Sequence, residues 1–100
     1  MRVLAIDPGF GRCGVAVLEK INHKETLLHS GCVETFSKTP FPERLHEVVS
    51  ACEKLMKKYK PDAVALEKLY FSTNQKTAMQ VAEVRGALIG MAARGGNPCF

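Results

Sequence analysis

The sequence predicts an α/β fold with a mixed sheet, in which a three-stranded antiparallel meander is followed by a parallel strand and flanked by helices. Three features predict it: three apolar runs joined by short turns, two helical segments after them, and a four-residue apolar run between the helices. With 100 residues, 46% of them hydrophobic, the chain suits one domain with a single core.

The meander comes first. Residues 2–6 form an apolar run that is stopped by Asp7-Pro8-Gly9, a sequence typical of turns. A second run covers residues 13–19 and a third covers residues 26–36, with the polar turn Asn22-His23-Lys24 between them. We expect each strand to lie antiparallel to the one before it.

An amphipathic helix is expected over residues 43–59, where apolar residues recur three and four positions apart. Pro42 suits its first turn, and Pro61 prevents its continuation. The apolar run 63–66 then predicts a buried strand, parallel to the first. Residues 97–100 resemble the beginning of another strand.

A second helix is expected from a cap at Ser72 or Thr73 to about Arg94, where two glycines stop it. Two apolar stripes require two packing partners, one of which can be a second subunit. One stripe consists of Val81, Leu88 and Ala92. The other, with the two glycines beside it, is the candidate dimer interface: Val84, Gly86, Ala87, Gly90 and Met91. Packing of the glycines against the sheet of the same chain is the alternative.

Two acids follow the strands that are expected to be parallel. Asp7 closes the first strand and Glu67 closes the strand 63–66. If these strands are neighbours, both carboxylates emerge at one edge of the sheet, where they can bind Mg²⁺ or Mn²⁺ and act on a phosphodiester. Taken singly, Asp7 could be an ordinary turn acid and Glu67 a surface acid beside Lys68.

The segment after Glu67 carries side chains suited to DNA. Tyr70 and Phe71 can stack on bases or wedge between them, while Lys68, Asn74 and Lys76 can meet phosphates. The alternative for the aromatic pair is that one ring packs beneath the loop.

Composition narrows the class of protein further. The net charge of +4 suits a polyanionic partner without requiring one. The four cysteines form no C-x-x-C pair, so a zinc site is not expected. The sequence has no apolar run long enough for a bilayer and no signal peptide, which predicts a cytoplasmic protein without a membrane partner.

A family resemblance rests on Ile6-Asp7-Pro8-Gly9, on residues 65–71, on Asn74 and on Val84-Arg85-Gly86. Across essentially all 100 residues, the chain resembles the RuvC Holliday junction resolvases, which have the ribonuclease H-like fold. The resemblance implies a magnesium-dependent endodeoxyribonuclease that cuts four-way DNA junctions in recombination and repair. It also implies a homodimer that works with a branch-migration helicase complex.

The resemblance also implies roles for individual residues. Asp7 and Glu67 match two of four metal-binding acids, and Tyr70 matches an aromatic that opens base pairs at the junction. Lys76 and Arg85, with Asn74, fall in the DNA-facing and helix-anchoring region. The other two acids lie beyond the last residue here, so residues 1–100 are predicted to be a single nuclease domain that is incomplete at its C-terminus, with little or no cleavage activity.

Three alternatives stay open at this point. One is another nuclease of the same fold, such as a YqgF-like resolvase or the nuclease domain of a CRISPR effector. Another is a non-catalytic DNA-binding or dimerisation fragment. The third is a sugar-kinase or actin-like ATPase, against which the lack of a second Gly-rich phosphate loop in the sequence counts.

Overall fold

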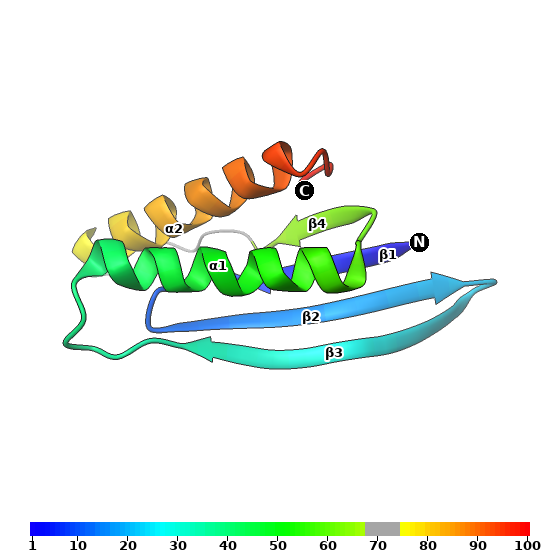
Figure 1. The fold of residues 1–100 in the computed structure, drawn as a ribbon, viewed down its shortest axis with the longest axis horizontal. Helices are drawn as coiled ribbons and strands as arrows, with labels where there is room; N and C mark the ends of the chain where they lie inside the picture. The colour runs from blue at the N-terminus through cyan, green and yellow to red at the C-terminus, as the bar shows by residue number, and fades with distance from the viewer. Residues whose placement is uncertain (68–74) are drawn as a thin grey trace.

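The computed structural model describes residues 1–67 and 75–100 of the chain. In this part of the chain, four strands form one sheet and two helices cover one of its faces (Figure 1). The elements in chain order are β1 (Arg2–Asp7), β2 (Arg12–Ile21), β3 (Lys24–Glu34), α1 (Phe41–Tyr59), β4 (Ala63–Leu66) and α2 (Gln75–Arg94).

The strands lie in the order β3-β2-β1-β4. β1 and β2 are antiparallel, as are β2 and β3, whereas β4 is parallel to β1. The predicted mixed sheet is therefore confirmed. The predicted polar turn joins β2 to β3, and its residues Asn22 and His23 have positive φ angles of 50° and 66°. β3 ends at Glu34, two residues before the expected end, because its partner β2 begins at Arg12, opposite Glu34.

The last residues of the chain pair with the outer edge of β4. Val64 forms a parallel bridge with Cys99, and Phe100 exchanges backbone hydrogen bonds with β4. Its N–H donates to the Val64 carbonyl at 2.9 Å, and its carbonyl accepts from the Leu66 N–H at 2.7 Å. The expected beginning of a further strand is present as this bridge.

Both helices end close to their predicted ends. α1 begins at Phe41, two residues earlier than expected, with a proline in its first turn. It ends before Lys60, which adopts φ 48° and donates its N–H to the Met56 carbonyl at 2.9 Å. α2 ends before two glycines, and Gly96 has φ 77°. Neither described helix has an apolar stretch long enough to cross a membrane.

The core lies between the helices and one face of the sheet. The buried residues of the central strands alternate along each strand, as expected for a sheet covered on one side. The sheet contributes Leu4, Ile6, Cys13, Val15, Val17, Val64 and Leu66. The helices contribute Val48, Cys52, Val84, Leu88, Met91 and Ala92.

The packing of α2 corrects one prediction. Val84, Leu88, Met91 and Ala92 are all buried on one face of the helix, whereas the sequence predicts that they are divided between two stripes. Their spacing of four, three and one residues places them on a single side. The prediction that Val84 and Met91 contribute to a dimer interface is therefore wrong, because both side chains fill the core of their own chain.

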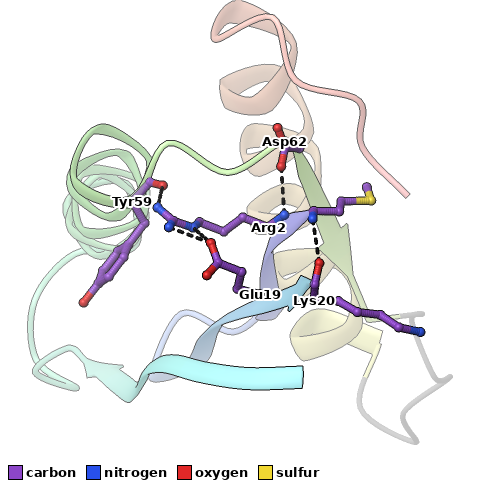
Figure 2. A network of polar contacts seen from close by, with 6 residues as sticks. Arg2, Glu19, Lys20, Tyr59 and Asp62 are labelled. Carbon is purple, nitrogen blue, oxygen red and sulfur yellow. Dashed lines mark hydrogen bonds and ion pairs between the residues drawn. The ribbon is translucent and has the colours of Figure 1, made fainter. Parts of the chain in front are cut away.

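An Arg2-centred network joins β1, β2 and the end of α1 (Figure 2). The Arg2 guanidinium donates to Glu19 Oε2 from Nε at 3.0 Å and from Nη2 at 2.7 Å, and from Nη1 to the Tyr59 carbonyl. The backbone N–H of Arg2 donates to Asp62 Oδ2 at 2.8 Å. This network ties α1 to the sheet at the end opposite the C-terminal ends of β1 and β4.

Candidate active site

The two acids predicted to form the site lie at the ends of neighbouring parallel strands. β1 and β4 pair with Ile6 opposite Leu66, and the Glu67 N–H donates to the Ile6 carbonyl at 3.0 Å. Asp7 and Glu67 therefore occupy equivalent positions at the ends of these two neighbouring strands. The expectation that these two strands are adjacent and parallel is confirmed.

The strand register that brings Asp7 and Glu67 together also affects their electrostatics. Hydrogen bonding to Asp7 and repulsion by its charge raise the pKa of Glu67 above its ordinary value. Both side chains are exposed, so burial has only a minor part in this shift. Two adjacent carboxylates at a sheet edge disfavour each other's ionised form, and a bound cation would relieve this repulsion.

Both acids belong to the face of the sheet that the helices leave uncovered. Ile6 and Leu66 point into the core, so the next residue on each strand faces the other way. A groove of about 540 Å³ lies over this face and reaches both acids. Small residues of the central strands and β3 line it, among them Ala5, Gly14, Ala16, Ser30 and Ala65. The carboxylates thus stand beside an open hollow with a floor of small side chains.

The donor set fits a hard divalent cation. Carboxylate oxygens are the ligands that Mg²⁺ and Mn²⁺ prefer, and Mg²⁺ is commonly held by one or two carboxylates together with water and substrate phosphates. Within residues 1–67 and 75–100, no group of three or more acids, histidines or cysteines gathers to complete a cage. In such a site, Asp7 and Glu67 would be two of the ligands.

The turn that follows Asp7 is closely packed. A Cβ atom on Gly9 would lie 2.1 Å from the Arg12 carbonyl oxygen, so only glycine fits there. The Thr35 N–H donates to the Gly11 carbonyl at 3.0 Å. These contacts keep the chain between β1 and β2 short and compact beside the acids.

Sequence reasoning missed a cluster that braces this turn. The Thr35 hydroxyl donates to the Phe10 carbonyl and accepts from Arg44 Nε at 2.9 Å. The Arg44 guanidinium lies over the Phe10 ring, with Cζ 4.9 Å from the ring centroid. Phe10 packs edge-on against Phe41 at 5.3 Å. The only signal in the sequence was an arginine in the first turn of a helix, which charge patterning by itself does not single out.

The predicted DNA-contacting residues divide into two groups. Lys68, Tyr70, Phe71 and Asn74 lie outside the described residues, so the structure places none of them. In α2, Lys76 is exposed in the first turn. Arg85 is partly buried, and its Nε is buried without a hydrogen-bond partner in the described part of the chain.

The remaining residues of the predicted dimer face lie away from the core. Gly86 and Gly90 are exposed, and nothing lies within 4 Å of a Cβ atom added at either position. Ala87 is half-buried. The alternative that the two glycines pack closely against their own sheet is therefore wrong. The exposed side of α2 presents small and apolar residues, namely Met79, Ala82, Gly86, Ile89, Gly90 and Ala93.

Comparison with known proteins identifies the family. The family model described as crossover junction endodeoxyribonuclease RuvC matches residues 3–99. The RuvC of Brachyspira hyodysenteriae is 46% identical over 89 residues, which are 89% of this chain and 56% of that protein. The RuvC of Petrotoga mobilis is 43% identical, with 89% of this chain and 55% of that protein covered.

A solved structure agrees with these matches. Thermus thermophilus RuvC in complex with a Holliday junction substrate superposes with a TM-score of 0.90 and 29% identity, covering all of this chain and 62% of that one. This match confirms the ribonuclease H-like fold. The chain spans a little more than half the length of the relatives that it matches. It belongs to the RuvC family of crossover junction endodeoxyribonucleases.

Proposed function

We propose that this chain supplies the sheet and part of the acidic active site of an endonuclease that resolves four-way DNA junctions in recombination and repair. The observation that carries the proposal is the meeting of Asp7 and Glu67 on adjacent parallel strands, on an open face of a RuvC-family fold. The junction bound by the Thermus thermophilus relative supports the choice of substrate.

Mg²⁺, or Mn²⁺ in its place, is the cofactor that we propose. Asp7 and Glu67 would hold it, and their mutual repulsion favours such binding. A divalent ion there supplies Lewis-acid activation of the phosphodiester and of the attacking water. The two carboxylates would hold it at the edge of the sheet. By resemblance to the family, two further acids from outside these 100 residues would complete the site, so the chain by itself would have little activity.

The DNA would approach over the edge that carries the acids. The segment that follows Glu67 leads from the acid pair to α2, so its Lys68, Tyr70, Phe71 and Asn74 are suitably placed in the sequence to contact DNA. Lys76, which is exposed at the start of α2, would add a phosphate contact. Arg85 would anchor α2, which carries Lys76.

A homodimer is part of the proposal. The exposed side of α2 carries Gly86, Gly90 and Ala87 at its centre, with the large apolar side chains Met79 and Ile89 exposed by 65% and 38%. Small residues let two helices approach closely, and apolar ones favour burial. We also propose a cytoplasmic location. A branch-migration helicase complex as partner rests on family resemblance alone.

The experiment is junction cleavage by the intact gene product that contains this chain. Wild type, Asp7→Asn and Glu67→Gln are compared on a labelled four-way junction, a linear duplex and an RNA duplex, with and without Mg²⁺. Glu25→Gln is the matched control, because Glu25 is an exposed acid on β3 near the hairpin, far from the site. Junction binding is measured in parallel without a divalent metal.

We expect wild type and Glu25→Gln to cut the junction only with Mg²⁺, while the two site variants bind it and cut at least about 100-fold more slowly, because charge stabilisation is lost. Preference for linear DNA or RNA would indicate another nuclease of this fold. Junction binding by wild type without any cleavage would indicate a non-catalytic DNA-binding protein.

A further inference from the structure

We infer that Arg44 binds a phosphate of the DNA strand held beside the Asp7–Glu67 edge, and that Thr35 positions it for this role. The inference rests on the proposed function, since it requires a DNA ligand. Arg44 lies in the first turn of α1, where the turn between β1 and β2 and the end of β3 also meet (Figure 1).

The guanidinium of Arg44 is held in one orientation. Its Nε donates to Thr35 Oγ1 at 2.9 Å, and its Cζ lies 4.9 Å from the centroid of the Phe10 ring. Phe41 supports that ring edge-on from the start of α1, at 5.3 Å between centroids. A hydrogen bond on one side and a ring below it fix the plane of the guanidinium, so little side-chain entropy remains to be lost when a ligand binds.

No carboxylate satisfies this cation in the described part of the chain. The ion pairs formed within residues 1–67 and 75–100 belong to Arg2, Arg12 and Arg94. The terminal nitrogens of Arg44 make no hydrogen bond within those residues, which leaves their N–H groups free for an external acceptor. A fork of planar N–H donors matches the oxygens of a phosphate.

The free nitrogens lie against the turn that follows the first acid. Arg44 Nη2 is 3.2 Å from the position that a Cβ atom on Gly11 would occupy, so the absent side chain leaves room for it. Gly11 lies four residues after Asp7, and the turn backbone is held by Thr35 through bonds to the Phe10 and Gly11 carbonyls. Arg44 thus lies at the same end of the sheet as the two acids, on the side that the helices cover, so a DNA strand that bends around this end can bring another of its phosphates to the guanidinium.

The competing explanation is that Arg44 only braces the turn. The two roles differ in what they predict for DNA binding. If Arg44 contacts a phosphate, its loss lowers the salt dependence of DNA binding and affects the contact with one linkage of the DNA. If Arg44 only braces the turn, its loss lowers the stability of the protein and weakens the contacts with all linkages alike.

The first test compares Arg44→Gln with wild type in the intact gene product. Glutamine removes the charge and keeps much of the stem over Phe10. Binding to a labelled four-way junction is measured by fluorescence anisotropy over a range of salt concentrations without divalent metal. Arg94→Gln is the matched control, since Arg94 also carries one charge and is exposed at the far end of α2. Thermal melts report folding.

We expect Arg44→Gln to weaken binding roughly tenfold and to lower the salt slope by about one, as for one lost phosphate contact. Arg94→Gln should change neither quantity. Arg44→Lys should keep most of the slope because it keeps the charge. Thr35→Val should weaken binding by releasing the guanidinium, and Thr35→Ser, which retains the hydroxyl, should restore it.

The second test locates the contact on the DNA. Single neutral methylphosphonate linkages are introduced along the strands near the crossover. A neutral linkage at one or two of these positions should lower the affinity of wild type. The same linkage should not lower the affinity of Arg44→Gln, because that variant has already lost the contact. A salt slope for Arg44→Gln equal to that of wild type, or the same methylphosphonate profile in both proteins, would overturn the inference.

Cleavage tests the proposed function, and DNA binding tests the role of Arg44, so the two can fail independently. If wild type binds junctions but does not cut them, the nuclease proposal fails, and Arg44 is still judged by the binding data. If wild type binds no DNA, both proposals fail. If Arg44→Gln does not fold, the methylphosphonate profile of Thr35→Val provides the comparison, and a wild-type profile in that variant would again overturn the phosphate contact.

Discussion

Replacing Arg2 with methionine removes the side chain at the centre of the network in Figure 2. Its guanidinium donates twice to Glu19 Oε2, at 2.7 and 3.0 Å, and once to the carbonyl of Tyr59 in the last turn of α1. The side chains of Arg2 and Glu19 are 33% and 25% exposed, so water screens their pair only in part. Methionine keeps the aliphatic stem, and the loss is therefore mainly polar.

The expected cost is about 2 kcal/mol in the free energy of unfolding. Roughly 1 kcal/mol comes from the partly screened pair with Glu19, near the upper end for surface pairs. About 1 kcal/mol more comes from the lost cation at the C-terminal carbonyl of α1, which is a charge-assisted hydrogen bond at the negative end of a helix.

The assay is urea unfolding of the intact gene product, with Arg12→Met as the matched control. Arg12 also pairs across strands, with Glu34, but at 3.6 Å and with 78% and 67% of the two side chains exposed. We expect no measurable change for Arg12→Met, since exposed pairs contribute little. Equal effects of the two substitutions, or an unchanged midpoint for Arg2→Met, would refute the reasoning from burial and helix capping.

Three further outcomes follow from the site and from α2. In the metal-free protein Asp7 raises the pKa of Glu67 above 4.5, so stability should fall as the pH rises through that raised pKa; Asp7→Asn should flatten this dependence in urea titrations, and an unaltered profile would argue against the pairing. Gly9→Ala places a Cβ atom 2.1 Å from the Arg12 carbonyl oxygen, so it should cost more than about 1 kcal/mol in urea unfolding and slow junction cleavage; wild-type values for both would show that the turn adapts. In Gly86→Leu, the new side chain has room within one chain, but it should separate two copies that pack through α2. Light scattering would then report a shift from dimer to monomer. An unchanged dimer mass would exclude this face of α2 as the interface.

Local patterns were sufficient for the order of the elements and for the acid pair. Short apolar runs ended by turn residues defined β1 and β4, and an acid directly after each run made both candidates for one site. The parallel pairing of the two strands was expected from the wholly apolar run of β4, and its neighbouring position was a condition that the strand order of the structure meets.

The burial of α2 could not be read in the same way. Apolar and small residues surround much of this helix, so several rotations about its axis would each bury an acceptable stripe. Contact with α1 and the sheet selected the rotation that buries Val84 and Met91 and leaves Gly86 and Gly90 exposed. The rotation of α2 is therefore set by close packing against α1 and the sheet, and the spacing of residues along the helix does not predict it.

The sequence by itself determined which segments are strands and helices and that an acid ends two of the strands, because these properties depend on neighbours a few residues apart, whereas the folded structure placed those two strands side by side. Only the tertiary structure decided that Arg44 meets Thr35 and Phe10 beside the turn after Asp7. Those residues come from α1, from the end of β3 and from the turn before β2. Their meeting depends on how the helix lies across the sheet, and that is set by the packed core as a whole.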